Sequence, residues 1–229
     1  MDAAIARLND PAAIPVETIQ SIALAIKAAS PRQRHIGIIY KNSDDPEVGT
    51  NLLDLGWHYI LSSGPVGPEY LWIAPAIEPE LAYVLAGLCK KVAEKYALPR
   101  RGIAYALRYD GDGLDIKTGE FMDRNGHGLT CATFVLAMFA SHGIPLLQLS
   151  EWPERKDDQA WQEDIVGVLR KRGVNEKHVN AVNEQVKRGC ARYRPEEVAA
   201  AGAAPSLPIG FTYAEELGKR IVEKLGSAR

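Results

Sequence analysis

The stretch NGHGLTCATFVLAMFASHG, residues 125–143, decides the expected fold because it places a cysteine directly after a glycine-rich loop, at the start of an apolar segment. Thr130 is a residue type that often caps the N-terminus of a helix, and Gly143 stands where a helix commonly ends. Between them, apolar side chains recur at helical spacing and would bury one face: Phe134, Val135, Met138 and Phe139. The sequence therefore predicts a buried helix that begins at Cys131.

This position gives Cys131 a chemical role to test. A thiol at the N-terminus of a helix lies at the positive end of the helix dipole and near unpaired backbone N–H groups, and both favour the nucleophilic thiolate. The same N–H groups can stabilise an oxyanion. The alternative is a cysteine that only packs in the core. We expect that packing role for Cys89, inside a helix predicted over residues 79–96, whereas Cys131 is the candidate nucleophile.

A nucleophilic thiol needs a base, and the chain offers five histidines. His35 opens a strand predicted over 35–40, and His58 lies near the end of a strand predicted over 51–61. Within that second strand Asp54 and His58 share one face. His35 is therefore the candidate base, and either Asp54 or His58 could orient it as the third member of a triad. For both histidines the alternative is a half-buried strand residue with a backbone partner.

The other histidines are weaker candidates for the base. His127 lies in the glycine loop, four residues before the cysteine, and could contact substrate or act as a local base. His142 is about 16 Å from the thiol along the same helix, at 1.5 Å of rise per residue. His178 belongs to a polar segment that we expect to be solvated. Tyr105 and Trp57 are further candidate substrate-binding residues, since their segments could form walls of a cleft.

The order of these motifs resembles a known group of enzymes. HIGIIY at 35–40, LLDL at 52–55 and TCATFV at 130–135 follow one another along the chain. This order is similar to the circularly permuted branch of the papain-like superfamily, which includes permuted NlpC-type peptidases and the lecithin–retinol acyltransferase group. In that branch the histidine strand precedes the cysteine helix. The resemblance covers roughly residues 33–145.

The resemblance implies specific roles and a fold. It makes His35 the base, Cys131 the nucleophile and Asp54 the orienting residue, with His58 as the alternative. The chain departs from the pattern at Thr130, where an asparagine often precedes the cysteine. The implied fold is α+β, with a small antiparallel sheet packed on the cysteine helix and extra N- and C-terminal helices. The implied activity is hydrolysis of an amide bond in a peptide or protein substrate through an acyl-enzyme.

Other functions use the same residues and stay open at this point. An acyltransferase or a glutamine deamidase would need the same triad, and a catalytically idle interaction module would keep only the scaffold. A metal-dependent hydrolase could use His35, Asp54 and His58, but they lack the spacing of a zinc motif. The acidic loop at 110–115 lacks the closing glutamate of a calcium loop. We therefore expect no metal and no cofactor.

Composition limits the class of protein. The chain has 229 residues, of which 46% are hydrophobic and 24% charged, which is near the average of globular proteins. A net charge of −2 gives no electrostatic reason to expect a nucleic-acid partner. Three widely spaced cysteines argue against a disulfide framework, so we expect a cytoplasmic protein, with signal-independent export as the alternative. No apolar run approaches the ~20 residues of a membrane span.

The pattern predicts two parts of the chain. Residues 1–150 are expected to form the catalytic core, with N-terminal helices at 3–9 and 15–29. Residues 151–229 are expected to form a helical extension packed on that core. Its helices are predicted at 158–172, 175–190, from about Pro195, and at 212–225, and the charged stretch 154–158 is expected to be a solvated loop. The oligomeric state is left open.

Overall fold

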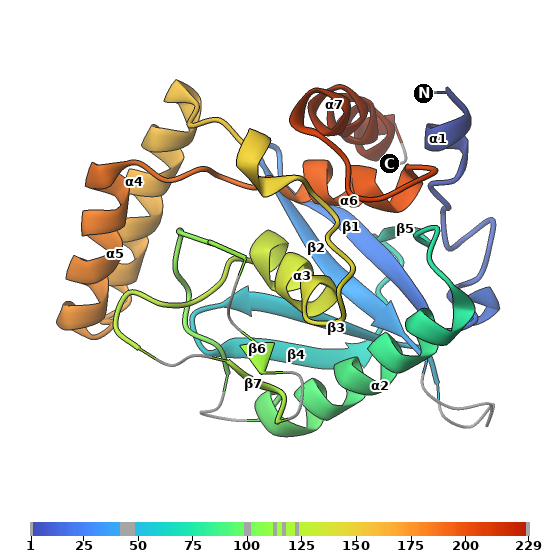
Figure 1. Ribbon diagram of the computed structural model, residues 1–229, viewed down its shortest axis with the longest axis horizontal. Coiled ribbons are helices and arrows are strands. Elements are labelled where there is room, and N and C mark those ends of the chain that lie inside the picture. Colours follow the sequence, from blue (N-terminus) through green and yellow to red (C-terminus); the bar gives the residue numbers. More distant parts are fainter. Residues whose placement is uncertain are drawn as a thin grey trace.

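The computed structural model describes residues 2–41, 49–98, 102–111, 114–115, 118–121 and 124–227. Its centre is a five-stranded antiparallel sheet in the order β4-β3-β2-β1-β5 (Figure 1). The main strands are β1 (Ile22–Ser30), β2 (Gln33–Tyr40), β3 (Asn51–Trp57), β4 (Ile60–Pro65) and β5 (Leu71–Ile73), and β6 (Leu114–Asp115) pairs with β7 (Glu120–Phe121) in a separate hairpin. The expectation of a mixed fold with a small antiparallel sheet is confirmed.

Seven α-helices accompany the sheet in the described part of the chain. They are α1 (Asp2–Ala6), α2 (Pro79–Tyr96), α3 (Cys131–Ala140), α4 (Lys156–Lys171), α5 (Glu176–Arg188), α6 (Pro195–Ala203) and α7 (Phe211–Ser227). Helix α3 packs on β2 and β3, and α6 packs on β1 and β2. Helices α4 and α5 form a pair to one side of the sheet, as Figure 1 shows. None of the described helices has the length and apolar character needed to cross a membrane.

The helix predicted over residues 15–29 is wrong. This segment contains a short 3-10 turn, Val16–Thr18, followed by strand β1. Side chains 22–26 are all buried, because β1 lies between β2 and β5 and alternate residues enter two different hydrophobic clusters. A continuous apolar run suits a central strand as well as a buried helix, and its periodicity alone does not separate the two. The position of the segment inside the sheet decides the outcome.

The single strand expected over 51–61 is also wrong. It is divided into β3 and β4 by a tight turn at His58 and Tyr59, where Tyr59 adopts a φ of 55°. His58 is therefore in the turn and does not share a face of β3 with Asp54. The sequence of residues 100–110 predicts a further strand, but the described part of this segment, residues 102–110, is irregular. Backbone hydrogen bonds still fix this segment, including one of 2.9 Å from the N–H of Leu129 to the carbonyl of Ala104.

The buried core runs across residue 150, the expected boundary between the two parts. One hydrophobic cluster joins the Leu24 and Ile36 face of the sheet with side chains of α2, α3, α6 and α7. A second cluster joins α4 and α5 with residues 105–107. The C-terminal helices begin within a few residues of their predicted starts, and Pro195 is the first residue of α6. The division at residue 150 itself stays a prediction.

Candidate active site

The candidate nucleophile, base and orienting residue come together at the end of the sheet where β2 begins and β3 ends. Nε2 of His35 hydrogen-bonds Oδ2 of Asp54 at a distance of 2.5 Å. Cys131, the first residue of α3, lines the same pocket as His35 and is close enough to raise the pKa of its imidazole. Because Nε2 faces the carboxylate, Nδ1 is the ring nitrogen left for the thiol. The structure thus brings His35, Asp54 and Cys131 to one place.

Gly37 explains how the carboxylate reaches the histidine. Side chains two residues apart on a strand share a face, so His35 and Gly37 point to the same side of β2. A Cβ atom added at Gly37 would lie 2.8 Å from the Cβ of Asp54 and 2.9 Å from the carbonyl oxygen of Leu53. The missing side chain therefore gives β3 the space to bring Asp54 across β2. The glycine of the HIGIIY motif is required by this close approach.

The start of α3 is fixed by a reciprocal cap. The N–H of Thr133 donates to the Thr130 hydroxyl at 3.2 Å, and the N–H of Thr130 donates to the Thr133 hydroxyl at 2.8 Å. The predicted N-cap role of Thr130 is confirmed. Cys131 is the first residue of α3, so no carbonyl of the helix accepts a hydrogen bond from its N–H. The cap thereby fixes both the thiol and a backbone donor beside it.

The environment favours a charged His35. Its side chain is 14% exposed and that of Asp54 is 15% exposed. Burial lowers the pKa of His35, but hydrogen bonds to Asp54 and Cys131 and the negative charges of both groups outweigh it and raise the pKa to about 9. The ring of Tyr70 is tilted by 64° from that of His35, with 6.4 Å between ring centroids. His35 is therefore held as an imidazolium cation at neutral pH.

A pocket of about 150 Å³ opens beside this group. Cys131 and His35 line it, together with Trp57 and Tyr105, whose ring centroids are 4.7 Å apart. Two of the three expected substrate-binding residues thus lie at the candidate nucleophile. The third, His127, is exposed and lines a different pocket, with Arg108 and Asp110. The structure does not bring His127 to the pocket that Cys131 lines.

Two other histidines have structural partners. His58 accepts a hydrogen bond of 3.0 Å from the N–H of Tyr105 through Nδ1, and its ring lies 4.9 Å from that of His178. His178 is 5% exposed, so the expectation that it is solvated is wrong. It accepts from the N–H of Gly126 and donates to the carbonyl of Tyr105, at 3.2 and 2.9 Å. Both histidines hold the segment that forms one wall of the pocket.

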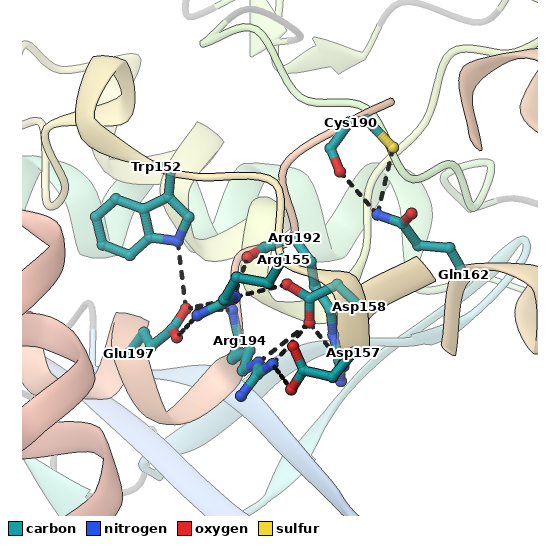
Figure 2. Close-up of polar contacts among 9 residues, drawn as sticks. All are labelled: Trp152, Arg155, Asp157, Asp158, Gln162, Cys190, Arg192, Arg194 and Glu197. Carbon is teal, nitrogen blue, oxygen red and sulfur yellow. Dashed lines mark hydrogen bonds and ion pairs between the residues drawn. The ribbon is translucent and has the colours of Figure 1, made fainter. Parts of the chain in front are cut away.

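The charged stretch 154–158, expected to be a solvated loop, instead contains the start of α4 and joins a buried ionic network. Figure 2 shows how Asp158, which is 1% exposed, accepts from three arginines. The distances are 2.6 Å to Arg155, 2.9 Å to Arg194 and 3.3 Å to Arg192. Glu197 of α6, 2% exposed, pairs with Arg155 as well. The network joins α4, α6 and the segment before α6.

Sequence reasoning missed several residues of the pocket. Arg34 and Arg192 line it, and so does Trp161 of α4. Arg34 precedes His35, and this adjacency was the available signal. Nothing in the sequence relates Arg192 or Trp161 to Cys131, because only the packing of α4 brings them to the pocket. No group of three or more metal-ligating side chains occurs among the described residues.

Comparison of the chain with protein-family models, curated proteins and solved structures finds no match.

Proposed function

We propose that this chain is a cysteine-nucleophile hydrolase that cleaves an amide bond through Cys131, His35 and Asp54. The observation that carries the proposal is the position of His35, which hydrogen-bonds Asp54 and lines the same pocket as Cys131. A thiol, an imidazole and an imidazole-orienting carboxylate are the three parts of a nucleophilic triad. The order along the chain, with the strand of His35 before the helix of Cys131, is the order that the resemblance to the permuted papain-like branch implies.

The chemistry follows from these positions. An imidazolium beside a sulfur atom stabilises negative charge on it. The Cys131 sulfur attacks the carbonyl carbon of the amide, a C–S bond forms, and the carbonyl π electrons move to oxygen. The N–H of Cys131 at the start of α3 is placed to donate to this oxyanion. Collapse of the intermediate breaks the C–N bond, and His35 gives its proton to the departing amine.

Release of the acyl group uses the same residues in reverse. Neutral His35 takes a proton from water as the water oxygen attacks the thioester carbonyl, and the Cys131 sulfur leaves as thiolate. Asp54 keeps the imidazole oriented and stabilises its charged form in both halves of the reaction. An amine in place of water gives acyl transfer with the same proton movements. Hydrolysis is the leading reaction because water needs no second binding site.

Thiol labelling tests this proposal without knowledge of the substrate. At pH 6 iodoacetamide should modify Cys131 much faster than Cys89 or Cys190. Burial raises the pKa of Cys89, and burial raises the pKa of Cys190 to about 11. Both side chains are also buried, whereas Cys131 is partly exposed. Mass spectrometry of peptides at short times gives the order of modification.

A matched variant separates a triad from mere exposure. His35→Gln keeps a polar side chain at the pocket but removes the cation, so it should slow labelling of Cys131 at pH 6 by more than tenfold. His58→Gln serves as the control, because His58 accepts from the N–H of Tyr105 and is not among the residues that line the pocket of Cys131. Modification of Cys89 or Cys190 before Cys131, or an unchanged rate in His35→Gln, would contradict the proposed nucleophile and base.

A further inference from the structure

Arg192 is a largely buried cation that lines the pocket. Its side chain is 17% exposed and its guanidinium carbon lies 3.8 Å from the centre of the Trp161 ring. Its ion pair with Asp158, at 3.3 Å, is the longest of the three that this carboxylate makes. Figure 2 shows Asp158 crowded by Arg155 and Arg194, which take its closer contacts. Arg192 is therefore held at the pocket, with Asp158 and the nearby Glu196 as the carboxylates that act on its charge.

Arg34 is a second cation at the same pocket. Its Nη1 donates to the backbone carbonyls of Ser30, Pro31 and Gln33 in the β1–β2 turn, at 3.2 to 3.4 Å. These contacts fix the guanidinium but supply no carboxylate, and no ion pair of Arg34 is found among the described residues. Its Nε is buried and has no hydrogen-bond partner in the described part of the chain. A buried donor without an acceptor is unfavourable until a ligand supplies one.

Apart from His35 and Cys131, the charged side chains that line the pocket are positive. Arg34 and Arg192 line it, and none of the described lining residues is Asp or Glu. The remaining lining is mostly apolar and includes the aromatic side chains of Trp57, Tyr105 and Trp161. Burial raises the pKa of Tyr105. The negative charge of Cys131 raises this pKa further, and the positive charge of Arg192 lowers it. A ligand with an apolar stem and an anionic end fits such a lining.

We propose that Arg34 and Arg192 bind a carboxylate of the substrate, close to the carbonyl that Cys131 attacks. The inference rests on the proposed function and names its substrate class: amides whose acyl or amine part carries a carboxylate near the scissile bond. Guanidinium groups pair with carboxylates through charge-assisted hydrogen bonds, and desolvation strengthens such pairs. This carboxylate belongs either to an acidic side chain of the substrate or to the free carboxyl end of its chain.

Small thiol-alkylating probes test this inference on the full-length protein. The first pair is bromoacetyl-glutamate amide against bromoacetyl-glutamine amide, which differ only in a side-chain carboxylate. The second pair is bromoacetyl-glycine against bromoacetyl-glycinamide, which differ only in a terminal carboxylate. Rates of Cys131 modification at pH 6 give an acid-to-amide ratio for each pair. We expect a ratio well above one in the pair whose carboxylate position matches the pocket, and that pair identifies the source.

Variants locate the carboxylate site. Arg192→Met and Arg34→Met should each lower the acid-to-amide ratio by about tenfold, the loss expected for one charge-assisted hydrogen bond. Arg172→Gln is the matched control, because this exposed arginine lies 5.4 Å from the Trp57 ring but does not line the pocket. Its ratio should equal that of the wild type. If Arg192→Met does not fold by circular dichroism, Arg34→Met carries the test, since its described contacts are confined to one turn.

The outcomes separate this inference from the proposed function. Fast modification of Cys131 by the neutral probes, with ratios near one in both pairs, overturns the carboxylate site and leaves the nucleophile in place. A high ratio that Arg34→Met and Arg192→Met do not change also overturns it, because His35 alone would then attract the anion. If no probe modifies Cys131 ahead of the other cysteines, the proposed function fails first.

Discussion

Replacing Asp54 by asparagine should lower the pKa of His35 while leaving the fold intact. Asparagine keeps the size of the aspartate side chain, so the Cβ packing over Gly37 is preserved. The change removes a carboxylate charge and converts the charge-assisted hydrogen bond at Nε2 into a neutral one. Burial, which lowers the pKa of His35, then acts with less opposition. The imidazolium should therefore lose its proton at lower pH than the wild-type value of about 9.

The size of the shift follows from the contact. A hydrogen bond to a charged group contributes roughly 1.5–3 kcal/mol, and about 1.4 kcal/mol corresponds to one pKa unit. The His35 pKa in Asp54→Asn should therefore fall by about one to two units. The remaining upward shift comes from Cys131, which still contacts the ring. The rate of amide hydrolysis should also fall. The asparagine amide can hold the His35 imidazole in the wrong tautomer, and in a triad this lowers the rate by up to about 10⁴-fold.

Nuclear magnetic resonance titration of the histidine ring protons measures the shift directly. The His35 signal is assigned by its absence in His35→Gln, and His142 serves as an internal reference because burial lowers its pKa. The reasoning predicts a downward move for His35 and none for His142. An unchanged His35 titration in Asp54→Asn would refute the role of the 2.5 Å contact. Equal activity of wild type and variant would remove Asp54 from the proposed mechanism.

Three further predictions concern stability. Gly37→Ala should lower the free energy of unfolding by about 1–3 kcal/mol in urea denaturation, because the added methyl group overlaps strand β3; wild-type stability would contradict the close approach. Glu197→Gln should cost about 3 kcal/mol because it leaves the buried Arg155 underpaired, whereas Glu184→Gln at an exposed ion pair should change little. Folding raises the pKa of His35 from 6.5 to about 9, so protonation of His35 stabilises the folded protein. This stabilisation is complete below pH 6.5 and is lost as the pH rises through 9, and it amounts to about 3 kcal/mol at most. Urea titrations from pH 6 to 10 should show this slope in wild type and a smaller one in His35→Gln.

Local signals in the sequence were sufficient for several elements. The cap at Thr130 and the apolar spacing after it predict the start of α3, and Pro195 predicts the first turn of α6. The β-branched residues at 35–40 predict a strand, and this strand is part of β2. These features depend on residues within one or two turns of each other. Such contacts are made by neighbours along the chain, so a single sequence is enough to identify them.

Only the tertiary structure decided which residues share the site. The residues alone leave Asp54 and His58 as candidates on one expected strand, and the resemblance favours Asp54. The turn after Trp57 leaves Asp54 at His35 and brings His58 to Tyr105. The run at 22–26 became a strand because sheet neighbours on both sides satisfy its backbone. Arg192 reaches the pocket through the buried network with α4. Register, turns and packing between distant segments determine these contacts, and a one-residue shift in a strand would reverse every side chain on it.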